Sequence, residues 1–348
     1  MDIEIVRGSI TPSLAEELTR LWVTHGALSE RDASARVGEV CAIGRDRAGV
    51  VVASSSFAPE TVPLLSDRRF LHYRAFAASD VPEPDMDDLF NMSFDEIAAE
   101  RGIDDDRETY DRSLPVGVFL TIEPSMWDRR PLAVWPRTEL RFAGYLPGGH
   151  QVRVRYFPRS FVIEPSPGWF RDFPPRERIR EFLPLRDGHS TRPYTGADEA
   201  AVRALWAREG AVSADDVDTR IAEVIFVGVD ADDAVVAVET AFLKRHLDMD
   251  LWSTRVYVAR EHRRSALATH LMLDAIDHLE QRFIDGVDLR APGILSETED
   301  VHSRGAFPIA HMSGMPYMVF AGIRADGAVR WVMFFPGAVA PGPAQPPE

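Results

Sequence analysis

One carboxylate, Glu239, stands in the middle of an apolar segment, residues 235–243, whose sequence is VVAVETAFL. An ionised side chain in such a segment has to face a cleft or a partner, because burying an unpaired charge is costly. The alternation of a strand sets Glu239 opposite Val238 and Thr240, and in a cleft it would act as a general base or bind a substrate amine. The other interpretation is a solvated position on an edge strand.

A second segment combines positive charge with small side chains. His262, Arg263 and Arg264 are followed by Ser265 and by the sequence ALAT, where a helical pattern begins. The first turn of a helix has unpaired backbone N–H groups and a partial positive charge, so it binds anions such as a pyrophosphate. Small residues let a phosphate approach the backbone. The segment therefore predicts an anion site, and the alternative is an ordinary capped helix with basic residues near its start.

The elements that position these residues follow from periodicity and turn signals in the C-terminal half. The patterns predict two helices, a hairpin, a third strand, a long amphipathic helix, a short strand, a short helix and a last hairpin. In chain order, these elements cover residues 195–209, 214–222, 225–229, 234–243, 252–259, 263–283, 287–291, 297–304, 318–323 and 329–335. The order predicts a mixed α/β sheet, mostly antiparallel, with one strand-to-helix crossover.

The chain also matches itself. The segment that begins with Leu21 and Trp22 aligns without a gap with the segment that begins with Leu205 and Trp206, at an offset of 184 positions. Near the ends of the two halves, FAG at 142–144 aligns with FAG at 320–322. The shared register predicts two copies of one structural unit. The predicted domains are residues 1–163 and 190–348, and the proline-rich, charged residues 164–189 are predicted to be a linker.

The element order and residues 257–272 resemble the GCN5-related N-acetyltransferase (GNAT) superfamily. Its signature is Arg/Gln-x-x-Gly-x-Gly/Ala at the start of a long helix; here Arg263 holds the first position, Ala266 replaces the first glycine and Ala268 holds the last. The resemblance implies an α/β fold of two tandem GNAT-like domains, each a mixed, mostly antiparallel sheet flanked by helices.

The same resemblance implies an acyl-coenzyme A as co-substrate, either acetyl-CoA or another acyl-CoA. Its pyrophosphate would lie on the N–H groups of residues 264–268, and its pantetheine would follow the strand over residues 255–259. The cofactor-binding residues that the resemblance implies are Tyr257, Val258, Arg263, Arg264, Ser265, Ala266, Leu267 and Ala268.

The N-terminal half departs from this pattern. The signature is absent from the matching stretch, which carries the acids Glu83, Asp85, Asp87 and Asp88. Carboxylates at this place would repel a pyrophosphate. Residues 1–163 are therefore predicted to be a degenerate GNAT-like domain without the coenzyme A site, and residues 190–348 to be the domain that has it.

The resemblance also implies a proton donor beside the sulfur of the thioester, a role that the Tyr of Tyr-x-x-x-Gly-Phe often has in the family. The matching residues 302–307 read HSRGAF, so His302 stands in place of the Tyr and Ala306 in place of the glycine. Histidine can donate a proton near neutral pH. His302 and Ser303 are thus the candidate acids beside Glu239, the candidate base. The alternative for His302 is a partly exposed helix residue.

Composition excludes several classes of protein. The chain has 348 residues and a formal net charge of −16, which disfavours general binding to nucleic acid or to an anionic membrane surface. No apolar run is long enough to span a bilayer and the N-terminus has no signal-peptide pattern, so a cytoplasmic location is expected. The single Cys41 excludes an internal disulfide. The histidines show no metal-ligand spacing, so no metal site is expected.

These observations lead to one principal hypothesis and one alternative. The first is an acyl-CoA-dependent N-acyltransferase of the GNAT type that transfers an acetyl group to a small-molecule amine, as a monomer or homodimer. Direct attack in a ternary complex is expected, because Cys41 lies in the degenerate half. Acylation of a protein or peptide amine is a further choice of acceptor. The alternative is a non-catalytic GNAT-like protein that binds a metabolite or a partner.

Overall fold

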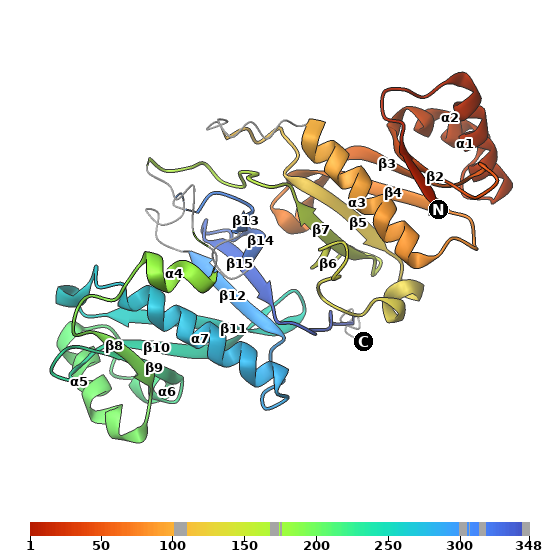
Figure 1. The fold of residues 1–348 in the computed structure, drawn as a ribbon. Helices are drawn as coiled ribbons and strands as arrows, with labels where there is room; N and C mark the ends of the chain where they lie inside the picture. Colours follow the sequence, from red (N-terminus) through yellow and green to blue (C-terminus); the bar gives the residue numbers. More distant parts are fainter. Residues whose placement is uncertain are drawn as a thin grey trace. The chain divides into compact units, whose positions relative to one another are not determined.

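The computed structural model describes residues 1–100, 110–167, 174, 176–298, 305, 307–312 and 318–342. Contacts between Cα atoms divide the chain into two compact units, Met1–Pro167 with Pro308–His311, and Gly168–Phe307 with Met312–Glu348. In Figure 1 the first unit runs from red to yellow-green and the second from green to blue. None of the helices in the described ranges is long and apolar enough to cross a membrane.

The first unit contains a mixed sheet flanked by helices. Its strand order is β1-β2-β3-β4-β5-β7-β6, and β4 and β5 pair in parallel at Leu71–Val118 and His72–Phe119. The other neighbours in this sheet are antiparallel. The main elements are β1 (Asp2–Ile5), α1 (Pro12–Thr24), α2 (Glu30–Arg36), β2 (Val40–Arg45), β3 (Val51–Val62), β4 (Arg68–Ala77), α3 (Glu83–Glu100), β5 (Gly117–Ile122), β6 (Arg141–Tyr145) and β7 (Gln151–Tyr156).

The second unit has the same kind of sheet. The order is β13-β14-β15-β12-β11-β10-β9-β8, and β11 and β12 pair in parallel at Trp252–Ile294. Its elements are α4 (Arg176–Phe182), β8 (Ser190–Pro193), α5 (Glu199–Glu209), α6 (Val217–Ile221), β9 (Val224–Val229), β10 (Val235–His246), β11 (Met249–Val258), α7 (Leu267–Ile284), β12 (Gly293–Thr298), β14 (Met318–Ile323) and β15 (Val329–Phe334), with a short strand β13 (His311–Met312) before β14.

Helices cover both faces of the second sheet. On one face, Trp206 of α5 packs with Val238 of β10. On the other face, Leu267 and Leu271 of α7 pack with Ala237 of the same strand, and Figure 1 shows α7 running across the strands. Successive side chains of a strand point to opposite faces. Val238 and Ala237 therefore mark the α5 face and the α7 face of β10.

The predicted fold class is confirmed, and so is the order of the main elements in the C-terminal half. Three of the predicted elements are wrong in place or extent. The strand predicted over 287–291 is irregular chain, and β12 begins at Gly293 instead. Glu297 and Thr298, predicted to be helical, belong to β12, while residues 299–304 lie outside the described chain. The long helix begins at Leu267 rather than at Arg263.

The shifted strand has a physical cause. Val287 and Leu289 alternate with polar residues as a strand would, but they are 62% and 65% exposed. Asp288 accepts hydrogen bonds from the main chain and the guanidinium of Arg290, which closes a turn there. At Gly293, a Cβ atom would lie 2.1 Å from the carbonyl oxygen of a β15 residue. The first position of β12 thus requires glycine, because two backbones approach closely.

Candidate functional site

The turn between β11 and α7 is built around two unusual backbone conformations. After β11 ends at Val258, a 3-10 helix covers Arg260–His262, and α7 begins at Leu267. Between them, Arg264 and Ala266 have φ angles of 74° and 63°. Both lie in the left-handed region, which glycine adopts at the lowest cost. This conformation explains why glycine would suit position 266, where the GNAT signature has it.

The turn lines an open cavity of about 410 Å³. Residues 256–258 and 262–269 form its lining. All eight predicted cofactor-binding residues are among them, namely Tyr257, Val258, Arg263, Arg264, Ser265, Ala266, Leu267 and Ala268. Two of these residues are arginines, and the N-terminus of α7 adds the partial positive charge of a helix dipole. The structure therefore brings the sequence-predicted residues together around one space with a positive lining.

Part of the predicted linker supports this turn. Ser265, which is 2% exposed, donates a hydrogen bond of 2.6 Å to the carbonyl oxygen of His262. The backbone N–H of Arg186 donates to the carbonyl oxygen of Ser265 at 3.2 Å. The ring nitrogens of His189 and His262 are hydrogen-bonded at 2.9 Å. The chain around residues 186–189 is thus part of the second unit and fixes the shape of the first cavity.

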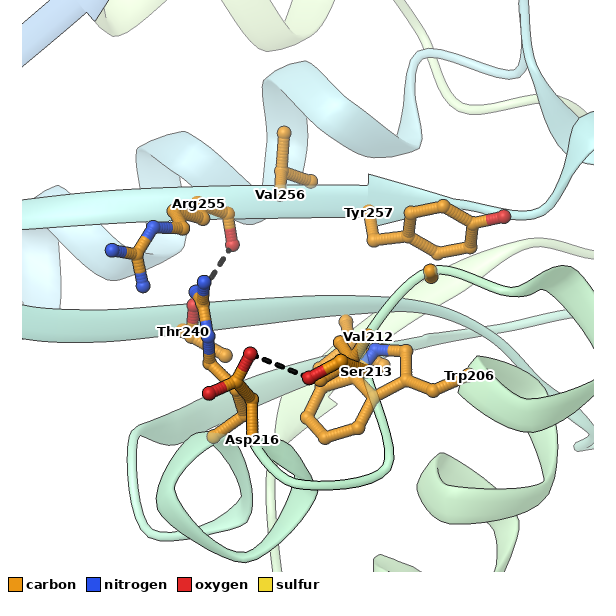
Figure 2. Close-up of a pocket in the computed structure, with 11 residues that line it drawn as sticks. Trp206, Val212, Ser213, Asp216, Thr240, Arg255, Val256 and Tyr257 are labelled. Atoms are coloured by element: carbon orange, nitrogen blue, oxygen red, sulfur yellow. Dashed lines mark hydrogen bonds between the residues drawn. The ribbon is translucent and has the colours of Figure 1, made fainter.

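A second cavity, of about 270 Å³, lies on the α5 face, between β10, β11 and the loop that follows α5 (Figure 2). Val256 and Tyr257 line both cavities, so β11 is their common wall. The other residues of its lining are Trp206, Ala211, Val212, Ser213, Asp216, Arg220, Val238, Thr240 and Arg255. The space is amphipathic, with aromatic and aliphatic groups beside three charged side chains, which is typical of a small-molecule site.

A half-buried polar contact holds Tyr257 in this wall. Its hydroxyl donates a hydrogen bond of 3.1 Å to Glu209, the last residue of α5. Burial works against ionisation of Glu209, but hydrogen bonds from Tyr257, from Arg208 and from the main chain of Arg260 hold the pKa of Glu209 below its ordinary value. Glu209 is therefore an ionised acceptor that ties α5 to the end of β11.

The first unit has a different pair at the matching positions. Phe76 pairs with Ser54 across β3 and β4, as Tyr257 pairs with Val238 across β10 and β11. His25, 184 positions before Glu209, contacts the Phe76 ring at a centroid distance of 5.7 Å. The sequence alignment of the two halves already held this signal, because it sets an acid against a histidine. Glu209 is not among the site residues predicted from the sequence.

Replacing Tyr257 with phenylalanine should weaken acetyl-CoA binding by about tenfold, because a hydrogen bond to a charged group contributes about 1.5–3 kcal/mol. Without it, the ring is no longer held in the wall of the two cavities. Calorimetric titration measures the change. Phe76→Leu is the matched control in the first unit and should leave the affinity unchanged. Wild-type affinity for Tyr257→Phe would show that the hydroxyl does not order the site.

Glu239 lies beneath α7 rather than in either of these two linings. It pairs with Val256 and shares the α7 face of β10 with Ala237. The side chain is 0% exposed, and within the described chain neither carboxyl oxygen has a hydrogen-bond partner. Burial raises the pKa of Glu239 to about 8; the nearby Thr254 hydroxyl opposes the rise and the charge of Asp274 adds to it. The solvated edge-strand interpretation is wrong, because β10 lies between β9 and β11. The role of Glu239 as a base or amine-binding group stays a prediction.

The two candidate acids, His302 and Ser303, lie outside the described residues. Their role in proton transfer stays a prediction. The nearest described elements on either side are β12, which ends at Thr298, and the short strand β13.

The acids of the first unit are held by cations at the start of α3. Arg130 forms ion pairs with Glu83 and with Asp87, the latter at 2.7 Å, and Arg137 pairs with Asp88 at 2.7 Å. These carboxylates thus fasten α3 to the loop around residues 130–137. In neither unit does the described chain group three His, Cys, Asp or Glu side chains that could hold a metal ion.

No protein-family model matches the chain, and no curated protein matches its sequence. Among solved structures, a GCN5-related N-acetyltransferase from Sphaerobacter thermophilus is 11% identical, with 81% of this chain and 83% of that chain covered and a TM-score of 0.26. A GNAT superfamily phosphinothricin acetyltransferase from Sinorhizobium meliloti in complex with AcCoA is 14% identical, covering 46% and 94%, with a TM-score of 0.29. A GNAT family acetyltransferase from Listeria monocytogenes is 14% identical, covering 42% and 95%, with a TM-score of 0.28.

The two units of the chain share one order of strands around their long helix. In each unit, one strand is followed by a long helix and then by a second strand that pairs in parallel with the first. These elements are β4, α3 and β5 in the first unit and β11, α7 and β12 in the second. Antiparallel strands complete both sheets. The chain therefore consists of two successive α/β units, each with the mixed, mostly antiparallel sheet expected from the sequence.

Proposed function

We propose that the chain is an acyl-CoA-dependent N-acyltransferase of the GNAT type, with acetyl-CoA bound in the second unit. The observation that carries this proposal is that the eight expected cofactor-binding residues line one cavity at the start of α7. The lining fits a pyrophosphate. Ser265, Ala266 and Ala268 are small enough for a phosphate to reach the backbone N–H groups, and Arg263 and Arg264 supply positive charge in a chain of net charge −16.

The second cavity is the proposed place of the acceptor, across β11 from the cofactor. Acetyl-CoA supplies an acyl carbon that is activated as a thioester. The acceptor amine forms an amide bond to that carbon, the carbon–sulfur bond breaks, the amine loses a proton and the sulfur gains one. Direct attack agrees with the state of Cys41, because burial raises the pKa of its thiol to about 12 and leaves no thiolate at neutral pH.

The two units are proposed to be copies of one fold, with domain boundaries at 1–163 and 190–348. Equivalent side-chain contacts support this. Ser29 donates to Asp32 at 2.7 Å in the first unit, and Ser213 donates to Asp216 at 2.6 Å in the second. The first copy is proposed to be degenerate, since ion-paired acids occupy the start of its long helix.

Calorimetric titration with acetyl-CoA tests the cofactor site, and release of free thiol with a panel of small amines tests the activity. Binding of acetyl-CoA without thiol release for any amine would favour the alternative, a non-catalytic binding protein. The observation that favours this alternative is Ala266, which has a φ angle of 63° where the signature has glycine. No binding of acetyl-CoA would overturn the proposed function.

His302 is proposed to protonate the leaving thiolate, with Ser303 as the second candidate. Replacing His302 with alanine should lower kcat about 100-fold, as expected for loss of a general acid. The affinity for acetyl-CoA should remain at its wild-type value. Ser303→Ala is the matched variant, and a larger loss of kcat in it would exchange the two roles. Normal turnover in His302→Ala would remove His302 from the mechanism.

A further inference from the structure

The second cavity contains an arrangement of charges that points to the chemistry of its ligand. Arg255 and Arg220 both line it, and both approach the same carboxylate, Glu223, at 3.3 Å and 3.9 Å. Two guanidinium groups thus share one acid. In Figure 2 Asp216 lies across the space from β11, and the Arg255 guanidinium extends along that strand, away from Tyr257. Asp216 brings a negative charge to the lining and accepts a hydrogen bond of 2.6 Å from Ser213.

Arg255 is held in a fixed orientation. Its guanidinium carbon lies 3.5 Å from the centroid of the Phe242 ring, so the planar group is stacked on an aromatic face. The Arg255 side chain is 43% exposed, while its partner Glu223 is 21% exposed. A stacked guanidinium presents its N–H groups along its edge, in the geometry that matches a carboxylate.

The first unit provides an internal comparison. Arg74 takes the sheet position of Arg255 and pairs with Glu39 at 3.1 Å. The ion pair itself is therefore a feature of the fold. The wall beside it differs, because the second unit has Tyr257, which is shared with the first cavity, where the first unit has Phe76.

We infer that the acceptor of the second unit is amino-acid-like, with a carboxylate close to the reacting amine. Arg255, assisted by Arg220, binds the carboxylate, and Asp216 attracts the ammonium form of the acceptor before it loses its proton. A lining that contains both signs of charge suits a zwitterion better than a simple amine. The inference rests on the proposed function, because it names the acceptor of that same site.

The experiment compares amino acids with amines that lack only the carboxylate, phenylalanine with phenethylamine and lysine with cadaverine. Thiol release from acetyl-CoA is followed for the wild type, Arg255→Gln and Arg74→Gln. In the wild type, kcat/KM should be at least about tenfold higher for the amino acid of each pair. Arg255→Gln should raise KM for the amino acids by about tenfold and leave the amines unchanged. Arg74→Gln should change neither, because it removes the same kind of ion pair in the first unit.

Three results would overturn the inference. They are equal use of both members of each pair by the wild type, an equal effect of Arg255→Gln on both members, and the same effect in Arg74→Gln. Acetyl-CoA titration of the same proteins separates this failure from failure of the proposed function. If acetyl-CoA binds and neither series is acylated, the acceptor class is wrong while the cofactor site stands. If acetyl-CoA does not bind, the proposed function itself fails.

Discussion

A chain in which Ala268 is replaced by glutamate should bind acetyl-CoA at least about 100-fold more weakly than the wild type. Ala268 is the second residue of α7 and lines the first cavity. A carboxylate there would face the expected pyrophosphate, and like charges in a poorly solvated site repel by several kcal/mol. The fold should not suffer, because an acid in the first turn of a helix interacts favourably with the helix dipole. Calorimetry measures the affinity, and thermal unfolding confirms the fold.

Ala268→Gln separates charge from size in this experiment. Its side chain is about as large as that of glutamate but carries no charge, so it should weaken binding much less. Equal losses of affinity in the two variants would mean that the size of the side chain, and not its charge, excludes acetyl-CoA from the cavity. Wild-type affinity in Ala268→Glu would place the anion away from the start of α7.

Replacing Glu239 with glutamine should make the folded protein more stable than the wild type at neutral and alkaline pH. The carboxyl group has an ordinary pKa of 4.5, which burial raises to about 8 in the folded chain. Below pH 4.5 the carboxyl group is neutral in both the folded and the unfolded chain, and stability is fully present. As the pH rises from about 4.5 to about 8, the group ionises in the unfolded chain but stays neutral in the folded chain, so the folded state loses stability. Each pH unit in this window costs about 1.4 kcal/mol, so the loss is on the order of 3 kcal/mol at pH 7.

Urea unfolding at pH 5, 7 and 9 measures this difference. Glu239→Gln should unfold with a free energy close to that of the wild type at pH 5 and should be the more stable protein at pH 7 and 9. Glu261→Gln is the control, since the Glu261 side chain is 72% exposed. Stability curves for wild type and Glu239→Gln that stay parallel across the pH range would show that the carboxyl is not neutral in the fold.

The parts of the site that sequence reasoning located are those whose residues are consecutive. Residues 262–269 are consecutive and cover the turn before α7 and the first residues of that helix, so their backbone groups lie close together. The hairpin of β9 and β10 was equally accessible, because two β-branched runs flank a turn of aspartates. Local pattern decides both features.

Contacts between distant segments were out of reach. Tyr257 and Glu209 are 48 residues apart, and His189 and His262 are 73 apart. Glu239 shows the related limit of strand patterns. Alternation separates it from its neighbours, but which face holds a cavity and which holds α7 depends on where the helix packs.

The hydrogen bonds from residues 186 and 189 to the turn before α7 bear on how independent the second copy is. Sequence similarity between the halves resumes only after these residues, so the repeated unit and the functional module have different limits. Under the proposed function, the connecting segment belongs to the cofactor-binding module although it lies outside both proposed copies. Substitutions in the connecting segment can therefore alter ligand affinity although they lie outside both repeats. Transfer of the repeat alone to another protein would carry over the sheet without the support of its first cavity.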